Sequence, residues 1–425
     1  MTSFALPSIG SSLIGNVSLK RTHSGITSSR KSKIRPSLDI HEKELVASEQ
    51  ICFVCNSELL KHGDNPVVNK DRLRFFWDLA THYGLLEKVT MISPKPATHQ
   101  ELMEYHTREY VNALRYYSLE TTTGSRLSPD TLAAYGLVEP DCAPFPGLYE
   151  HASWVAGATL TAARVLNADI SRVVFNFSGG RHHAKMDTAG GYCFVGDIPL
   201  GINELKKKFK RIMYIDVDVH HGDGVEESFD DDPQVMTISL HKFGKGFYPE
   251  TGSLKDIGSG LGRYTSVNVP LHDGMDDEAY WYIYTNVVTQ AFERFKPGVV
   301  VIQCGTDTLT KDPIGTFSLS VYGLARCIDF AIRLPVHVMA LGGGGYSNPN
   351  AARLWTQILA LATDSAPLPV DIPEHERFGE YEPHYMLQIE PCASEVNLNS
   401  REYLDMIKDK IINNLKKLPL QTDFE

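Results

Sequence analysis

The sequence predicts an α/β protein built on a parallel β-sheet that is covered by helices on both faces. From about residue 50, short apolar runs rich in β-branched residues alternate with amphipathic segments, which is the pattern of repeated βαβ units. The apolar runs are nearly continuous, as expected of strands that are buried on both faces. Polar clusters follow directly after several of these runs, at the place where α/β sheets bind ligands.

Each expected element is assigned from its hydrophobic pattern. Strands are assigned to apolar runs that are too short for core helices, and helices to segments in which apolar residues recur every three or four positions. The expected elements, in chain order, are strand 51–55, helices 72–86, 100–118 and 148–166, strands 172–177, 211–219, 235–240 and 265–271, helix 277–295, strand 298–305, helix 319–333, strand 336–345, helix 349–364, a loop over 366–399 and helix 400–417. We expect them to form one domain over residues 46–420.

Residues 1–45 are expected to form a disordered basic tail, because they are rich in Ser and low in aromatic residues. Residues 1–40 carry a net charge of +5, which leaves −16 for the rest of a chain whose total is −11. An acidic core disfavours direct nucleic-acid binding and favours basic peptides. The stretch RKSKIRP at 30–36 fits a nuclear-import signal, the acid-free start also fits a mitochondrial presequence, and a plain solvated tail remains open.

The seven cysteines are scattered without a disulfide spacing, and no secretory segment is recognised at the N-terminus. Both features favour an intracellular protein in the nucleus or cytoplasm. No apolar run is long enough to predict a membrane span. Cys52 and Cys55 form a single C-x-x-C without a second pair at zinc-finger spacing, so we expect an ordinary strand there.

The stretch IDVDVHHGDG at 215–224 places carboxylates and imidazoles directly after an apolar run. Burial of such groups is costly unless a metal or the groups themselves compensate. Asp218 and His220 are two residues apart on an extended chain, so their side chains point to the same side. Asp307 ends another apolar run and is the natural third ligand of a metal site with open positions. The ligand set suits zinc, with ferrous iron or cobalt as alternatives. A structural network of ion pairs is the competing interpretation.

His182 and His183 follow a third apolar run and are preceded by two glycines. They are not needed as ligands if the three residues above bind the ion. They suit a proton-transfer pair if Asp216 and Asp223 each accept a hydrogen bond from one imidazole and fix its tautomer.

The stretch MALGGGGY at 339–346 has four glycines after a strand, but it lacks the Lys-Ser/Thr of a phosphate-binding loop. The glycines instead allow Tyr346 to approach the metal. A phenol at that place donates a hydrogen bond to a developing oxyanion.

Taken together, six ordered motifs resemble the zinc-dependent histone deacetylases, closest to class I, and the resemblance covers roughly residues 50–417. The motifs are SGGRHHAKMDTAGGYCF, YIDVDVHHGDGVEESF, TISLHKFGKGFYPETG, VNVPLHDGMDDEAY, CGTDTLTKDPIGTFSLS and ALGGGGY. The resemblance implies an arginase-like α/β fold with an eight-stranded parallel sheet, and zinc-dependent hydrolysis of N6-acetyl-lysine in proteins such as histone tails.

The resemblance also implies roles for individual positions. It assigns metal ligation to Asp218, His220 and Asp307, proton transfer to His183 and His182 with Asp223 and Asp216, and oxyanion binding to Tyr346. It assigns substrate binding to Asp141, Gly191, Tyr192, Tyr248 and Arg72. It implies a structural potassium ion near Asp216, Asp218, His220, Ser239 and Leu240.

The match departs from the family pattern at a few positions. Tyr192 and Tyr248 stand where phenylalanines are usual in the acyl-lysine tunnel. Arg181 replaces an apolar residue beside the inner cavity, and Lys311 replaces a glycine after Asp307. These changes leave the acyl preference open.

The resemblance also bears on partners. His272 and Pro349 stand where corepressor-bound members have phosphate-binding arginines, which argues against an inositol-phosphate-dependent corepressor complex, and we expect a monomer. Hydrolysis of acetylpolyamines or longer acyl-lysines, and a non-catalytic acyl-lysine-binding scaffold, are the alternative functions. Cys142 and Cys193, next to pocket residues, form a hypothetical redox pair.

Overall fold

The computed structural model describes residues 50–123, 127–138, 140–391 and 395–418, so the expected basic tail lies outside the described residues. Within these ranges, eight parallel strands form one sheet in the order β2-β1-β3-β8-β7-β4-β5-β6. The strands are β1 (Ile51–Val54), β2 (Thr90–Ile92), β3 (Val173–Asn176), β4 (Ile212–Asp216), β5 (Val235–Lys242), β6 (Ser266–Leu271), β7 (Val299–Gln303) and β8 (His337–Leu341). The predicted α/β class and parallel sheet are confirmed.

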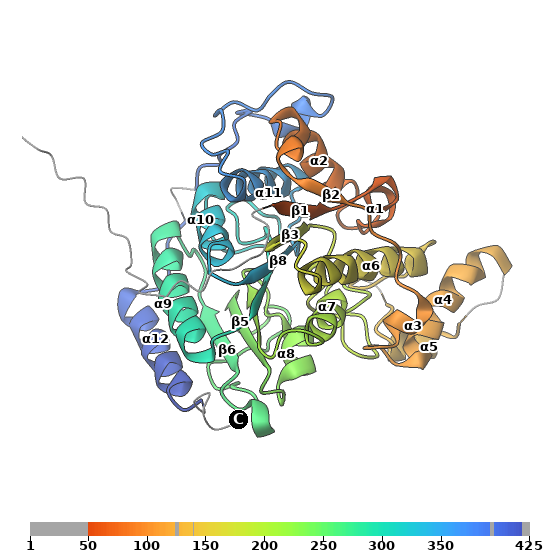
Figure 1. Ribbon diagram of the computed structural model, residues 1–425, viewed down its shortest axis with the longest axis horizontal. Helices are drawn as coiled ribbons and strands as arrows, with labels where there is room; N and C mark the ends of the chain where they lie inside the picture. Colours follow the sequence, from red (N-terminus) through yellow and green to blue (C-terminus); the bar gives the residue numbers. More distant parts are fainter. Residues whose placement is uncertain (1–49, 124–126, 139, 392–394, 419–425) are drawn as a thin grey trace, which may run out of the picture. The chain divides into compact units, whose positions relative to one another are not determined.

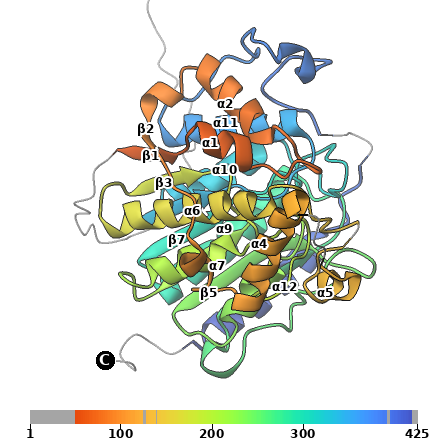
Figure 2. The ribbon, with the colours of Figure 1, turned by 90° about the vertical axis from the view of Figure 1, so that its right-hand side faces the viewer.

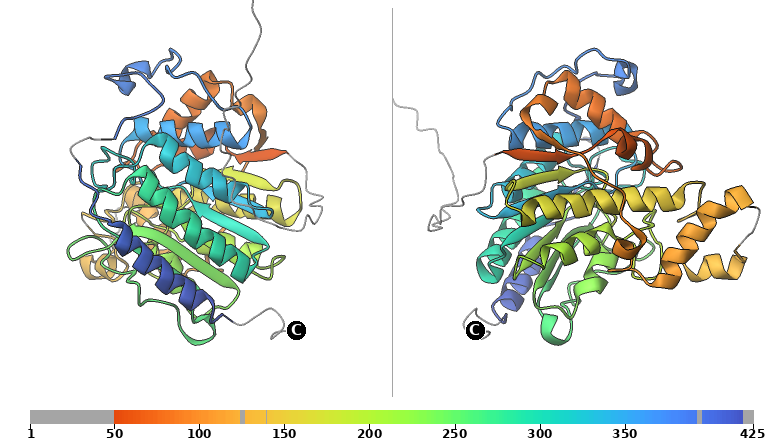
Figure 3. Two further views of the ribbon diagram at one scale, coloured as in Figure 1. Left: turned by 90° about the vertical axis from the view of Figure 1, so that its left-hand side faces the viewer. Right: turned by 45° about the vertical axis from the view of Figure 1, so that its right-hand side comes forward.

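Helices cover both faces of the sheet. One layer contains α2 (Arg72–His82), α9 (Asp277–Phe295), α10 (Val321–Ile332), α11 (Asn348–Ala362) and α12 (Arg401–Leu415), and its neighbours pack on one another (Figure 3, left). The opposite layer contains α6 (Leu148–Asn167), α7 (Asp197–Leu205) and α8 (Asp223–Phe229) (Figure 1). Every residue of β3, β4, β7 and β8 is buried, which explains why these strands appear as unbroken apolar runs.

Four further helices lie beside this framework: α1 (Ser57–His62), α3 (His99–Leu102), α4 (Arg108–Thr123) and α5 (Pro129–Ala134). Figure 2 shows α4 next to α6, with which it is in contact. The segment predicted as one helix over 100–118 is divided between α3 and α4. A capping box, in which Thr98 and Glu101 bond each other's backbone N–H groups, starts α3 at His99. No helix in the described ranges is long and apolar enough to cross a membrane.

Candidate active site

The polar clusters of the sequence all lie at the carboxyl ends of neighbouring strands. The central strands β3, β8, β7 and β4 are adjacent in the sheet, so the loops that follow them converge. The site residues that these loops supply are His182 and His183 after β3, Asp218 and His220 after β4, Asp307 after β7, and Tyr346 after β8. The fold therefore brings together residues that are distant in the sequence.

Asp218, His220 and Asp307 form a buried cluster whose ligand atoms lie within 4.8 Å of one another. His220 Nδ1 is 3.1 Å from Asp218 Oδ1 and 3.3 Å from Asp307 Oδ2. Asp307 Oδ2 is buried and has no hydrogen-bond partner. Burial, followed by repulsion from Asp218, raises the pKa of Asp307 to about 7. Two buried carboxylates, one of which has an unsatisfied oxygen, and an imidazole nitrogen fit a divalent cation such as zinc.

The glycines after β8 leave room for the side chains of the cluster of Asp218, His220 and Asp307. Asp218 Oδ2 accepts hydrogen bonds from Gly344 N–H at 2.8 Å and from Gln303 Nε2 at 2.7 Å. A Cβ on Gly344 would lie 2.2 Å from Asp307 Oδ2. Any side chain at position 344 would therefore displace a carboxylate of the cluster.

A second group of three, His182, Asp216 and Asp218, is also close enough to hold an ion. Its middle member is already satisfied by hydrogen bonds. Asp216 Oδ2 accepts from His182 Nδ1 at 2.8 Å and from the Tyr214 hydroxyl at 2.6 Å, and its Oδ1 accepts from Asp218 N–H at 3.1 Å. The group with Asp307 fits a cation better, because only that group has an orphaned oxygen.

Two histidine–aspartate pairs lie beside the cluster. His182 Nδ1 donates to Asp216 Oδ2 at 2.8 Å, and His183 Nδ1 donates to Asp223 Oδ1 at 2.7 Å. Burial opposes protonation of His182, but the nearby carboxylates, Asp216 first, raise its pKa to about 9. Burial and the neighbouring His182 lower the pKa of His183 to about 4. His183 is therefore the neutral imidazole of the two at neutral pH.

The backbone of Tyr346 is held in place by a hydrogen bond to Asp312. Its N–H donates to Asp312 Oδ2 at 2.8 Å, and the other oxygen of Asp312 accepts from two backbone N–H groups of its own loop. Burial, with the charges of Asp307 and Asp218, keeps the pKa of the Tyr346 phenol well above its usual value. The phenol thus stays protonated and can donate a hydrogen bond. Asp312 is a site residue that the sequence pattern does not reveal.

The preceding residue, Gly345, has a φ of +119°, and a Cβ there would meet Thr306 Oγ1. Only glycine fits, which explains the glycine before Tyr346. Lys311, in the loop that carries Asp312, also has a left-handed backbone with a φ of +66°. This loop therefore takes a conformation that disfavours a side chain at position 311.

The expected pocket residues lie around these groups. Asp141 Oδ2 accepts from Gly191 N–H at 3.0 Å. The Tyr192 ring packs edge-on against Tyr346 at 5.7 Å between centroids, and the Tyr248 ring packs against His183 at 4.9 Å. The two tyrosine rings thus flank the site at the positions that the resemblance gives to the tunnel.

Arg72 and Arg181 are both buried, and the Nε atom of each lacks a hydrogen-bond partner. Arg72 Nη1 donates to Gly345 O at 2.9 Å, and Arg181 Nη2 donates to Gly63 O at 3.0 Å. Burial and the charge of Arg181 lower the pKa of Arg72 to about 10. Two guanidinium groups therefore share this inner region.

Cys142 and Cys193 are free and buried. Burial raises the pKa of both thiols, that of Cys193 to about 12. Little thiolate is available at neutral pH for the hypothetical redox exchange, which stays a prediction.

Comparisons with known proteins identify the family of the chain. A family model described as "Histone deacetylase domain" matches residues 66–362. Histone deacetylase HDAC1 of Drosophila melanogaster is 39% identical over 383 residues, which are 88% of this chain and 71% of that protein. Histone deacetylase 8 of Xenopus tropicalis is 44% identical over 329 residues, 77% of this chain and 88% of that protein. Histone deacetylase 1 of Homo sapiens is 38% identical over 378 residues, 87% of this chain and 76% of that protein. On these matches, the chain belongs to the histone deacetylase family.

Proposed function

We propose that this protein is a zinc-dependent protein-lysine deacetylase whose metal ligands are Asp218, His220 and Asp307. Hydrolysis of acetyl-lysine amides is the activity of its family. The observation that carries the ligand assignment is the buried, unsatisfied Oδ2 of Asp307 beside His220 Nδ1. When bound there, zinc supplies a Lewis acid that polarises the amide carbonyl and acidifies a water molecule.

In this proposal His183 is the general base. Its Nδ1 proton is held by Asp223, so Nε2 is the nitrogen that takes a proton from the attacking water and later delivers it to the leaving amine. The lowered pKa of His183 supports this role, because the imidazole is free to accept a proton at neutral pH. His182, hydrogen-bonded to Asp216, carries a positive charge and helps to position His183.

Tyr346 in this proposal donates a hydrogen bond from its hydroxyl to the carbonyl oxygen as negative charge develops there. Its buried, protonated phenol supports the role. The hydrogen bond from Tyr346 N–H to Asp312 ties the loop of Tyr346 to the loop that follows Asp307.

Substrate binding is assigned to the surrounding pocket. Tyr192 and Tyr248 present flat rings to the four methylenes of an acyl-lysine, while Asp141 accepts from the substrate backbone at the rim. Arg72 lies on the inner side, where it can attract the acetate product. Gly191 gives the rim a residue without a side chain, because a Cβ there would lie 2.1 Å from His183 Cδ2.

A structural potassium ion is proposed near Asp216, Asp218, His220, Ser239 and Leu240. Its support is the pairing of β4 with β5, which sets Asp216 opposite Ser239. Replacement of potassium by choline in the buffer should lower the melting temperature if the site is real. An unchanged melting temperature would contradict it.

The acidic core supports acetylated basic peptides, such as histone tails, as substrates. The curated relatives carry the name histone deacetylase, which supports a role in chromatin and a location in the nucleus or cytoplasm. A monomer with a catalytic domain over 46–420 is the simplest arrangement.

The deciding experiment is an assay of the zinc-loaded protein on acetyl-lysine peptides, acetylpolyamines and longer acyl-lysines. We expect the acetyl-lysine peptides to be hydrolysed fastest, and His183→Ala to abolish the activity while it retains zinc. Faster hydrolysis of an acetylpolyamine would mean that acetylpolyamines, and not acetyl-lysine peptides, are the preferred substrates. Binding of acyl-lysine without any turnover by the wild type would favour a scaffold.

A further inference from the structure

A lysine ammonium lies against the outer oxygen of one of the dyad carboxylates. Asp223 Oδ1 accepts from His183 Nδ1 at 2.7 Å, while Asp223 Oδ2 lies 3.6 Å from Lys185 Nζ. The two oxygens of Asp223 are therefore divided between an imidazole and an ammonium. Lys185 Nζ also donates to Glu227 Oε2 at 2.5 Å. Asp223 and Glu227 are one turn apart on α8 and repel each other, and the single positive charge of Lys185 lies close to both carboxylates and reduces that repulsion.

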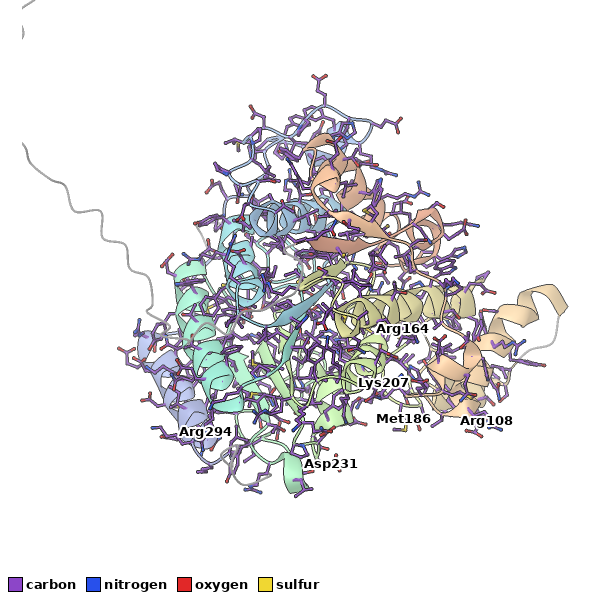
Figure 4. The ribbon with its side chains drawn as sticks, in the orientation of Figure 1. Arg108, Arg164, Met186, Lys207, Asp231 and Arg294 are labelled. Atoms are coloured by element: carbon purple, nitrogen blue, oxygen red, sulfur yellow. The ribbon has the colours of Figure 1, made fainter. Side chains whose placement is uncertain are left out.

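Backbone contacts hold Lys185 at this place. Its N–H donates to Thr188 O at 2.9 Å, which closes a tight turn. Met186 O accepts from Thr107 N–H at 3.0 Å and from His106 Nδ1 at 3.0 Å. Figure 4 shows Met186 beside the start of α4, where Arg108 is labelled. The turn that carries Lys185 is thus anchored to the segment that precedes α4.

The segment that carries the two histidines also lies directly on α8. Val225 N–H donates to His182 O at 3.3 Å. A Cβ on Gly224 would lie 2.7 Å from Ala184 O, so the two backbones approach closely. His183 and Lys185 are two residues apart in one segment of chain, and both contact the Asp223 carboxylate.

We propose that Lys185 is a positioning residue for proton transfer: its ammonium holds Asp223 in the orientation in which Asp223 fixes the tautomer and the ring of His183. The inference rests on the proposed function, because Lys185 acts through the His183–Asp223 pair. Without the ammonium, Asp223 Oδ2 loses its contact with Lys185 Nζ. The carboxylate then turns more freely, and His183 loses the fixed direction in which it takes a proton.

Three variants test the role of the charge. We expect Lys185→Met and Lys185→Gln to lower kcat by about two- to fivefold, the size of effect that an ion pair with a 37% exposed lysine allows. KM and zinc content should stay within about twofold, since no substrate or metal contact is removed. Lys185→Arg keeps the charge and should restore kcat.

Lys207 is the matched control. Its Nζ lies 2.7 Å from Glu204 Oε2 and 3.9 Å from Glu104 Oε2, so it also joins two carboxylates. Lys207, labelled in Figure 4, lies between the end of α7 and the start of β4, whereas the site residues follow the carboxyl ends of the strands. Lys207→Met should keep the wild-type kcat. Wild-type kcat in Lys185→Met would overturn the proposal. A kcat in Lys185→Arg as low as that in Lys185→Met would also overturn it, because the charge would then not matter.

A second measurement separates this inference from the proposed function. The Nδ1 proton of His183, hydrogen-bonded to Asp223, should give a downfield proton NMR signal that is assigned by its loss in His183→Gln. We expect Lys185→Met to shift or broaden that signal and Lys185→Arg to preserve it. An unchanged signal in Lys185→Met would overturn the positioning role. Absence of deacetylase activity in the wild type would sink the proposed function and leave the NMR result to decide on Lys185.

Discussion

Asp307 holds a buried carboxylate oxygen that no hydrogen bond satisfies, next to the carboxylate of Asp218. If the pair binds zinc, Asp307→Asn should lose both zinc and turnover, because the amide removes the negative charge that the ion needs. Metal analysis of the purified protein and a peptide assay measure the two effects. Asp329→Asn, which changes a surface ion pair on α10, should affect neither. Full zinc and full turnover in Asp307→Asn would mean that the site lies elsewhere.

The same substitution has an opposite effect on the metal-free protein. Burial and Asp218 raise the pKa of Asp307, which means that its charged form destabilises the fold when no cation is bound. Metal-free Asp307→Asn should therefore melt at a higher temperature than the metal-free wild type. Zinc should then raise the melting temperature of the wild type alone. A lower melting temperature of the metal-free variant would contradict this electrostatic account.

Tyr346 carries a prediction about turnover. Tyr346→Phe keeps the ring against Tyr192 and removes only the hydroxyl, so zinc content and folding should not change. Turnover should fall by about 10²–10³, the usual cost of losing one oxyanion donor. Tyr322→Phe, on the exposed side of α10, is the control. An unaltered rate, with chemistry shown to limit turnover, would remove the oxyanion role from Tyr346.

Some of these residues are predictable from the sequence, and others are not. Asp218 and His220 are recognisable because alternation along an extended chain puts both on one side. Asp312 is not recognisable, because its contact with Tyr346 N–H exists only after the loops that follow β7 and β8 have met. The Lys185 contact with Asp223 is hidden for the same reason. Sequence spacing reveals local pairs, whereas pairs across loops depend on the fold.

At the scale of elements, long and strongly periodic segments are predicted well. Strands β3 to β8 and helices α6, α9 and α11 lie close to the predicted ranges. The edge strand β2, Thr90–Ile92, is missed because three residues carry no measurable alternation. The short helix α8 is also missed, since its residues 223–229 begin with Asp and Gly, and their helical form depends on packing against the 182–184 backbone.

The contact between α9 and α12 gives a prediction about stability. Arg294 on α9 donates to the last carbonyls of α12, at 3.1 Å to Leu415 O and 3.0 Å to Lys416 O, and it also bonds Leu418 O. Figure 4 shows Arg294 at the end of this pair of helices. Arg294→Ala should lower the free energy of unfolding by about 1–3 kcal/mol, because it leaves helix-end carbonyls unsatisfied and removes a cation from the negative end of the dipole.

Urea denaturation measures this loss. Arg294→Lys keeps the charge but not the fork of donors, so its stability should lie between those of the wild type and Arg294→Ala. Arg74→Ala removes an exposed arginine with a long ion pair of 3.8 Å and should change stability by less than about 0.5 kcal/mol. If Arg294→Ala were no less stable than this control, the carbonyl contacts would contribute nothing measurable.

For the whole molecule, buried histidines predict acid sensitivity. His106 accepts from Gly196 N–H through Nε2 at 2.9 Å and donates through Nδ1 to Met186 O, so it is neutral in the folded state. Burial lowers its pKa from 6.5 to about 4, and burial with Arg181 lowers that of His151 to about 3. The unfolded chain binds these protons first. The contribution of these two histidines to stability should therefore be constant above about pH 6.5, and it should fall by a few kcal/mol between about pH 6.5 and pH 4.

Urea denaturation at pH 7.5 and pH 5 measures this loss. His106→Gln supplies one donor and one acceptor without a titrating group, so the difference between the two pH values should shrink. His384→Gln, at an exposed position, should leave the difference as in the wild type. An equal difference in all three proteins would contradict the assignment to His106.

The position of the last strand in the sheet has a consequence for synthesis on the ribosome. Strand β8 lies between β3 and β7, so the half-sheet β2-β1-β3 and the half-sheet β7-β4-β5-β6 stay unjoined until residues 337–341 leave the exit tunnel. Until then, the apolar edges of β3 and β7 are unpaired, because β8 has not yet been synthesised. Unpaired strand edges promote aggregation. A nascent chain stalled before residue 337 should therefore remain bound to chaperones and be digested by added protease. One stalled beyond residue 418, with enough linker to clear the tunnel, should become protease-resistant.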